Sequence, residues 1–143
     1  MAAPCSVRSP KLTSPALVRL SSDTATARLL YTADFHTDDT RLLSGSTARP
    51  EADVVLCEST YANVDHESRA AVEEQFAETT RTTLWEGGTV VVPAFAIGRT
   101  QELLMVCAAH DIDCYVDGMG VEVLSMLRGY PDFLRNSDAL DRA

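Results

Sequence analysis

The sequence predicts an α/β fold, and three observations support that class. In the second half of the chain, short β-branched runs alternate with segments of helical hydrophobic period. Glycines and prolines separate these segments, as is typical of the ends of helices and strands. The chain has 143 residues, of which 45% are hydrophobic, enough to bury a core. An alternation of strands and helices predicts a parallel sheet with right-handed crossovers.

The first half of the chain contains a predicted hairpin followed by a polar stretch. Two short apolar-rich runs, 16–20 and 27–32, flank a polar turn at residues 21–23, which is a hairpin pattern. Residues 33–46 are polar and are expected to form a loop. The next strand is expected over 53–57, because the run VVLC is bounded by polar residues.

The second half predicts helices alternating with two further strands. The first helix is expected over 65–86, with Asp65 as its N-cap and a glycine pair at its end. The following elements are a strand over 89–92, a helix over 101–110 capped by Thr100, a strand over 112–116, a helix over 119–127 and one more helix starting at Ser137. Because ligands of parallel sheets gather at the carboxyl ends of strands, the turns after the three predicted strands are expected to converge.

The charge of the chain is strongly acidic. There are 12 Lys plus Arg against 21 Asp plus Glu, and Lys11 is the only lysine. The composition gives no sign of a basic nucleic-acid patch. Acidity combined with lysine depletion favours adaptation to concentrated salt, where screening reduces self-repulsion; an ordinary acidic protein is the alternative. We therefore expect the unfolding midpoint to rise from low to molar KCl, and equal stability in both would argue against salt adaptation.

Targeting to a membrane or to the exterior is not expected from the sequence. Residues 1–10 lack the apolar stretch of a signal peptide, and no run reaches the roughly 20 apolar residues of a transmembrane helix. A cytoplasmic protein without a membrane partner is the prediction.

The four cysteines do not match a zinc finger or ribbon. They form no Cys-x-x-Cys pair, which such sites usually contain. Cys57, Cys107 and Cys114 lie in apolar runs and are predicted to be buried as small hydrophobic residues.

Two acidic residues stand where predicted strands end. Asp34 follows the run LLYTA and can ligate a metal, act as a base or form an Asx-turn; the residues alone favour the turn. Glu58 follows four apolar residues, so its carboxylate must lie in a cleft, be paired or belong to a surface loop.

A basic residue and a glycine pair give weaker signals. Arg99, after a glycine and before a helix, can contact a phosphate or pair with an acid such as Glu102. Gly118 and Gly120 begin a dinucleotide-binding pattern, but Val123 replaces its third glycine. A nucleotide-binding domain is therefore a minor alternative.

Three segments resemble one known family in their order and spacing. They are LLYTADFHTDDTRLL (29–43), ADVVLCESTYA (52–62) and GGTVVVPAFAIGRTQELL (87–104), followed by YVDGMG and YPDFLR. These segments resemble the β-CASP branch of the metallo-β-lactamase superfamily. That branch includes cleavage and polyadenylation specificity factor nucleases, archaeal relatives that process messenger-RNA 3′ ends, and ribonuclease J. With the acidic composition, the resemblance suggests a haloarchaeal member.

The resemblance implies a role for each matched residue. The family hydrolyses RNA phosphodiesters with two zinc ions in a cleft between two domains. Asp34 matches the carboxylate that bridges both metals. Glu58 matches the first β-CASP motif, an acid that orients a histidine which helps to protonate the leaving oxygen. Phe95, Gly98 and Arg99 match the loop that faces the RNA channel, so RNA is the implied partner.

The resemblance also implies a domain organisation. Residues 1–60 would be the C-terminal piece of a metallo-β-lactamase half-domain, and residues 61–143 the first part of a parallel-sheet β-CASP domain. Periodicity alone places the strand 53–57 in one sheet with the next two strands. The resemblance instead assigns that strand to the metallo-β-lactamase part.

The sequence departs from the family at the metal ligands. It contains three histidines, none of them in the family's His-x-His-x-Asp-His spacing. Asp34 is the single matched ligand, whereas a dinuclear site needs about three or four ligands per ion. We therefore expect a fragment of a zinc-dependent RNA-processing nuclease that is inactive alone. A homodimer or a complementing chain would have to supply the missing ligands, and a non-catalytic RNA- or protein-binding half-domain is the alternative.

Overall fold

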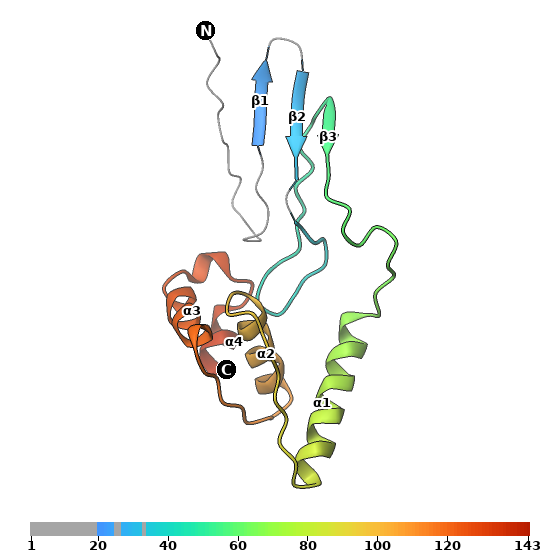
Figure 1. Ribbon diagram of the computed structural model, residues 1–143. Coiled ribbons are helices and arrows are strands. Elements are labelled where there is room, and N and C mark those ends of the chain that lie inside the picture. Colours follow the sequence, from blue (N-terminus) through green and yellow to red (C-terminus); the bar gives the residue numbers. More distant parts are fainter. Residues whose placement is uncertain (1–19, 25–26, 33) are drawn as a thin grey trace. The chain divides into compact units, whose positions relative to one another are not determined.

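The computed structural model describes residues 20–24, 27–32 and 34–143, which divide between two compact units. The first unit comprises residues up to Asp39 together with Leu43–Asn63. The second comprises Thr40–Leu42 and Val64–Ala143. The described residues form a small sheet with a parallel strand pair and four α-helices, so the predicted α/β class is confirmed (Figure 1).

The first unit contains a three-stranded sheet. Its strands are β1 (Leu20–Thr24), β2 (Ala27–Tyr31) and β3 (Val54–Leu56), in the spatial order β1-β2-β3 (Figure 1). β1 is antiparallel to β2, and β3 is parallel to β2. The polar residues 21–23, expected in the hairpin turn, lie in β1. The predicted strand over 16–20 lies outside the described residues except for Leu20.

An ionic cluster aligns the parallel pair at its start. The Arg28 backbone N–H donates to Asp53 Oδ2 at 2.7 Å, and the Asp53 N–H donates to the Arg28 carbonyl at 2.9 Å. The Arg28 guanidinium also contacts Glu51 at 2.9 Å. Hydrogen bonds from the backbone and then the side chain of Arg28 lower the pKa of Asp53. This register determines which residues of the two strands lie side by side at the ends of β2 and β3.

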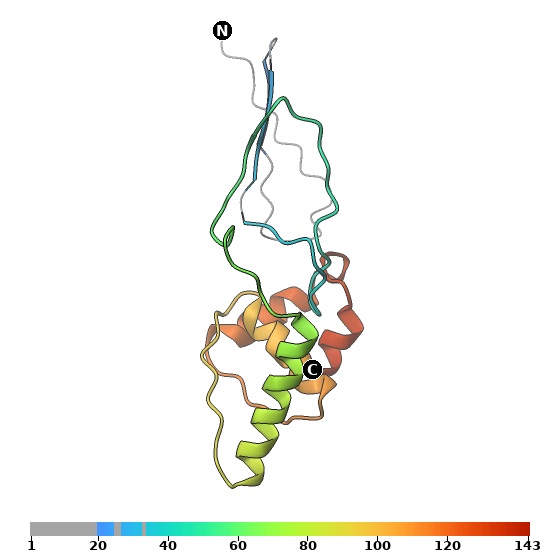
Figure 2. The same ribbon diagram turned by 90° about the vertical axis from the view of Figure 1, so that its right-hand side faces the viewer.

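The second unit consists of helices packed around a central one. Its elements are α1 (Arg69–Trp85), α2 (Arg99–Ala109), α3 (Met119–Arg128), the 3-10 helix η1 (Pro131–Phe133) and α4 (Ser137–Arg142). α2 contacts each of the other three α-helices (Figures 1 and 2). The buried apolar side chains of this unit are Leu42, Ala77, Leu104, Met105, Val106, Cys107, Ile112 and Leu140. In the part of the chain that is described, no helix combines the length and the apolar character needed to cross a membrane.

Two predicted helix caps are wrong. α1 begins after Ser68, whose Oγ accepts a hydrogen bond from the Ala71 N–H, so Asp65 is not the N-cap. α2 begins after Gly98, two residues earlier than the Thr100 cap implies. The Thr100 hydroxyl instead donates to the Phe95 carbonyl at 2.8 Å. The side chain of Ser68 caps α1, whereas Gly98 has no side chain and its own N–H donates to Gln101 Oε1 at 2.8 Å.

Two predicted strands are not strands within the described residues. The runs 89–92 and 112–116 carry no strand assignment, so the parallel sheet expected for residues 61–143, and its convergence of three turns, are not observed. The single sheet expected from periodicity is also wrong, because β3 pairs with β2. A strand needs a neighbouring backbone ladder, and β-branched residues alone do not provide one. Val91 is 84% exposed, consistent with an uncovered run.

The burial predicted for the cysteines holds for one of the three that the structure describes. Cys107 is buried in α2, as expected. Cys57 and Cys114 are exposed, because each lies in a segment where no second layer of side chains covers it.

Candidate functional site

Asp34 and Glu58 leave the sheet of the first unit from neighbouring strand ends. The Thr32 N–H donates to the Leu56 carbonyl at 2.9 Å, and the Glu58 N–H donates to Thr32 Oγ1 at 3.3 Å. The first bond extends the parallel backbone pairing beyond β2 and β3, and the second joins the same two segments through the Thr32 side chain. Because parallel strands end at the same edge, Asp34 and Glu58 stand at one edge of the sheet, where α/β proteins place ligands.

The two acids have different surroundings. Glu58 is half-buried, and its Oε2 accepts a hydrogen bond from the Thr60 N–H at 2.9 Å. Asp34 is exposed, and none of the described residues donates a hydrogen bond to its carboxylate, so the Asx-turn favoured by the residues alone is not formed. The Asp34 carboxylate is therefore open to a ligand.

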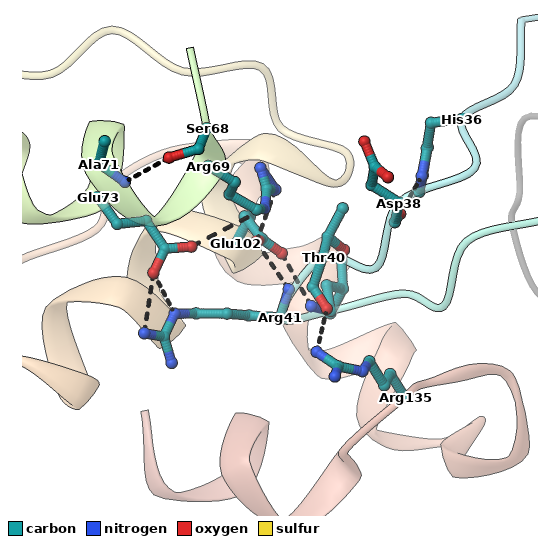
Figure 3. A network of polar contacts seen from close by, with 11 residues as sticks. His36, Asp38, Thr40, Arg41, Ser68, Arg69, Ala71, Glu73, Glu102 and Arg135 are labelled. Atoms are coloured by element: carbon teal, nitrogen blue, oxygen red, sulfur yellow. Dashed lines mark hydrogen bonds and ion pairs between the residues drawn. The ribbon is translucent and has the colours of Figure 1, made fainter.

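The loop after Asp34 is held by its own backbone. The His36 Nδ1 lies 2.7 Å from the Asp38 carbonyl, a contact drawn in Figure 3. Asp39 Oδ1 accepts from the Gly45 N–H at 2.9 Å, and the Ser46 N–H donates to the His36 carbonyl at 2.9 Å. His36 and Asp39 therefore make hydrogen bonds within the loop. Their positions in the sequence do not predict these contacts.

The described residues do not fit a complete zinc centre. Within the described ranges, no three side chains of His, Cys, Asp or Glu converge as a metal site would require. Asp34 is one exposed carboxylate, and a zinc site needs several ligands around each ion.

In the second unit, a fully buried glutamine organises the loop before α2. Gln101 Oε1 accepts from the Gly98 N–H at 2.8 Å, and its Nε2 donates to the carbonyls of Ala96 and Gly120 at 3.0 Å each. Gly98 has φ +77°, a conformation that side chains with Cβ rarely adopt. The loop is therefore fixed by backbone contacts that depend on Gln101.

The same glutamine places the start of α3 beside the start of α2. A Cβ at Gly120 would lie 2.8 Å from Thr100 Cγ2, so only glycine fits without movement there. Gly118, the N-cap of α3, has φ +74°. Two of the three turns predicted to converge are thus adjacent, one before α2 and one before α3.

The loop presents the residues matched to an RNA-facing role. Phe95 is 84% exposed and Ile97 is 70% exposed, although both are apolar. Arg99 is exposed, and no described acid pairs with it. The alternative in which Arg99 pairs with Glu102 is wrong, because other groups occupy Glu102. The loop therefore offers an aromatic ring and a free guanidinium to solvent.

Glu102 is a buried carboxylate with three donors (Figure 3). It is 7% exposed. Its Oε1 accepts from the Arg41 N–H and from Arg69 Nη2, each at 2.8 Å, and its Oε2 accepts from the Leu42 N–H at 2.8 Å. A buried charge is tolerated only when it is paired and hydrogen-bonded, and Glu102 meets both conditions.

Further contacts hold the segment Thr40–Leu42 in the second unit (Figure 3). The Arg41 guanidinium contacts Glu73 at 2.8 Å. The Arg135 side chain donates to the Thr40 carbonyl at 2.8 Å, and the Arg135 N–H donates to the Leu42 carbonyl at 2.9 Å. These contacts account for the membership of Thr40–Leu42 in the second unit.

The burial of Glu102 could have been predicted from helical period. Glu102 lies three and four residues before Met105 and Val106, both buried on α2. A carboxylate on the apolar stripe of a helix must find a buried partner. Its partners, however, come from segments far away in the sequence, and helical period gives no information about them.

Comparison with known proteins identifies archaeal relatives, of which two are named as RNases and one as a transcription termination factor. No protein-family model matches the chain. The chain is 39% identical over 120 residues to the probable RNase MJ4 of Methanocaldococcus jannaschii, covering 80% of this chain and 28% of that protein. It is 32% identical to RNase aCSPSF2 of Saccharolobus solfataricus, covering 89% and 26%. It is 35% identical to the transcription termination factor FttA of Pyrococcus abyssi, covering 83% and 20%. The chain thus spans between a fifth and under a third of these relatives' lengths.

Proposed function

We propose that this chain, a homologue of the β-CASP ribonucleases of the metallo-β-lactamase superfamily, is part of a zinc-dependent nuclease that processes RNA. The observation that carries this proposal is the position of Asp34 and Glu58. The motif match assigns a metal-bridging role to Asp34 and a histidine-orienting role to Glu58. The parallel pairing of β2 with β3 brings the ends of their strands together. We further assign residues 1–60 to a metallo-β-lactamase segment and residues 61–143 to a β-CASP segment.

Each acid has surroundings that suit its proposed role. Asp34 is exposed and accepts no hydrogen bond from described residues, which leaves both carboxylate oxygens available to a metal. Glu58 is anchored through Oε2 by Thr60, so its Oε1 can accept from a histidine N–H and orient that ring. The partner histidine and most zinc ligands are not in this sequence. We therefore propose that the chain alone neither binds two zinc ions nor cleaves RNA.

The RNA-facing part of the proposal rests on the loop before α2. Phe95 offers an exposed ring on which a base can stack, and Arg99 offers an exposed cation for a phosphate. Gly98 lets the backbone approach closely because it has no side chain. The chain carries a formal charge of −9, so its overall electrostatic field repels RNA. Binding of RNA therefore requires a local favourable contact such as this one.

Replacing Arg99 by alanine should weaken binding of a single-stranded oligoribonucleotide and lower its dependence on salt. Loss of one phosphate contact should reduce the slope of log affinity against log salt by about 0.7. Fluorescence anisotropy over a KCl series measures both quantities. Arg142→Ala on α4 removes the same charge outside the loop and should leave the slope nearly unchanged. If Arg99→Ala binds with the affinity and slope of the parent chain, the proposed contact is wrong.

A non-catalytic binding half-domain is the second candidate. It is favoured by apolar side chains that stay exposed in one segment, namely Val91, Phe95 and Ile97. In that case the folded chain would bind RNA or a protein without ever supporting hydrolysis. Adding a separate polypeptide that carries the missing histidine motif separates the candidates, because only the nuclease proposal expects RNA cleavage to appear.

A further inference from the structure

The loop before α2 and the first turn of α3 are joined by one side chain. Gln101 Nε2 donates to the Ala96 carbonyl in the loop and to the Gly120 carbonyl in α3, at 3.0 Å each. Because one amide nitrogen serves both carbonyl oxygens, the two backbone segments lie close together. The start of α3 therefore adjoins the loop that the proposed function assigns to RNA.

Thr100 makes a second connection between the same two segments. Its hydroxyl donates to the Phe95 carbonyl at 2.8 Å, and its backbone N–H donates to that oxygen at 3.1 Å. Its methyl group faces Gly120, where an added Cβ would lie 2.8 Å from it. The backbone at Phe95 and the backbone at Gly120 thus meet the same threonine. Met119, the residue before Gly120, begins α3 beside the loop that carries Phe95.

Three large apolar side chains stay exposed where the two segments meet. Phe95 is 84% exposed, Ile97 is 70% exposed and Met119 is 69% exposed. We call these three residues the junction patch. Single exposed apolar residues are ordinary on a protein surface, whereas a group of them on adjoining segments marks an interaction site.

The charges beside the junction patch differ between its two sides. On the α2 side, Arg99 is exposed and pairs with none of the acids that the structure describes. On the α3 side, Asp117 and Glu122 are exposed carboxylates. A phosphate is attracted to the first side and repelled by the second, where a carboxylate can accept a hydrogen bond from an uncharged base. This asymmetry fits a nucleotide with its phosphate at Arg99 and its base at Met119.

We propose that Met119 is a further RNA-binding residue, and that Met119 and Phe95 hold the same unpaired base of a single-stranded RNA. The inference rests on the proposed function, which assigns Phe95 and Arg99 to the RNA-facing loop, and it adds the start of α3 to that surface. An aromatic ring stacks on any base, and a thioether is polarisable and adapts to an irregular shape. A duplex cannot use this site, because its bases are already stacked and paired.

Replacing Met119 by alanine in the full chain should weaken binding of a short single-stranded oligoribonucleotide about threefold to tenfold. The slope of log affinity against log salt should stay that of the parent chain, because Met119 carries no charge. Fluorescence anisotropy over a KCl series measures both quantities. The parent chain should bind the same strand less tightly after it is annealed to its complement, and Met119→Ala should not change that weaker binding.

Met126→Ala is the matched control for this substitution. Met126 is also an exposed methionine of α3, at 53%, and it lies about two turns further along the helix. Its replacement should leave the RNA affinity at the parent value. Circular dichroism at 222 nm should be the same for both variants and the parent chain, since both side chains are exposed.

A double variant tests whether Phe95 and Met119 hold one base. Phe95→Ala combined with Met119→Ala should lose less affinity than the product of the two single losses, because either change alone already releases the base. A loss equal to that product would show that the two residues make separate contacts, and it would overturn the shared base.

The other outcomes separate this inference from the proposed function. If Arg99→Ala weakens binding while Met119→Ala matches the parent chain, the loop contacts RNA without α3 and the inference is wrong. If Met119→Ala dissociates a dimer of the chain and leaves the RNA affinity unchanged, the junction patch binds a second copy and the inference is again wrong. Absence of RNA binding by the parent chain would contradict both this inference and the RNA-facing part of the proposed function.

Discussion

Replacing Glu102 by alanine should destabilise the second unit by about 3 to 5 kcal/mol, the usual cost of breaking a buried charge pair. The substitution leaves the N–H groups of Arg41 and Leu42 and the guanidinium of Arg69 without their acceptor. Leu42 is itself 3% exposed, so water cannot easily replace the carboxylate. Urea unfolding followed by circular dichroism at 222 nm measures the effect, because all α-helices described lie in this unit.

The chain offers a closely matched control for this substitution. Glu122 occupies the same position in α3 that Glu102 occupies in α2, the first turn after a glycine with positive φ. Glu122 is exposed, so Glu122→Ala should cost no more than about 1 kcal/mol through the helix dipole. Glu102→Gln should fall between the two, because the amide retains one acceptor. Equal midpoints for Glu102→Ala and Glu122→Ala would show that the buried network is not formed.

Replacing Gln101 by alanine should cost about 2 to 3 kcal/mol and loosen the loop before α2. The change removes three hydrogen bonds and leaves the Gly98 N–H and the carbonyls of Ala96 and Gly120 unpaired. Urea midpoints give the overall cost. Hydrogen exchange of the Gly98 amide gives the local effect, which should be faster exchange in the variant.

Two further variants define the role of Gln101. Gln75→Ala, at an exposed position on α1, should change stability by less than about 0.5 kcal/mol. Gln101→Glu keeps an acceptor for Gly98 but cannot donate to the two carbonyls, so it should be no better than alanine. Stability of Gln101→Glu equal to that of the parent chain would contradict the donor role.

The helices could be predicted from the sequence better than the strands. α3 begins at Met119 and α4 at Ser137, as expected, because glycine and polar capping residues act locally. The runs 89–92 and 112–116 have the composition of strands but lack a ladder partner among the described residues. Strand formation depends on a distant neighbour, and composition does not identify that neighbour.

The candidate site was also predictable only in part. Asp34 and Glu58 were identified because each charge follows an apolar run, and a motif could be matched around each. Their placement at one sheet edge required the parallel register of β2 and β3. The contacts of Glu102 join residues about 60 positions apart, such as Arg41 and Leu42, and no local pattern specifies them.

The zinc content of the purified chain tests the central proposal most directly. The chain should be prepared in molar KCl without chelator and its bound zinc measured by atomic emission, with Asp34→Ala as the comparison. We predict far less than one zinc per chain for both proteins, because Asp34 is the single matched ligand in this sequence. Close to two zinc ions per chain would contradict the proposal, since the histidines and acids present would then form a complete site.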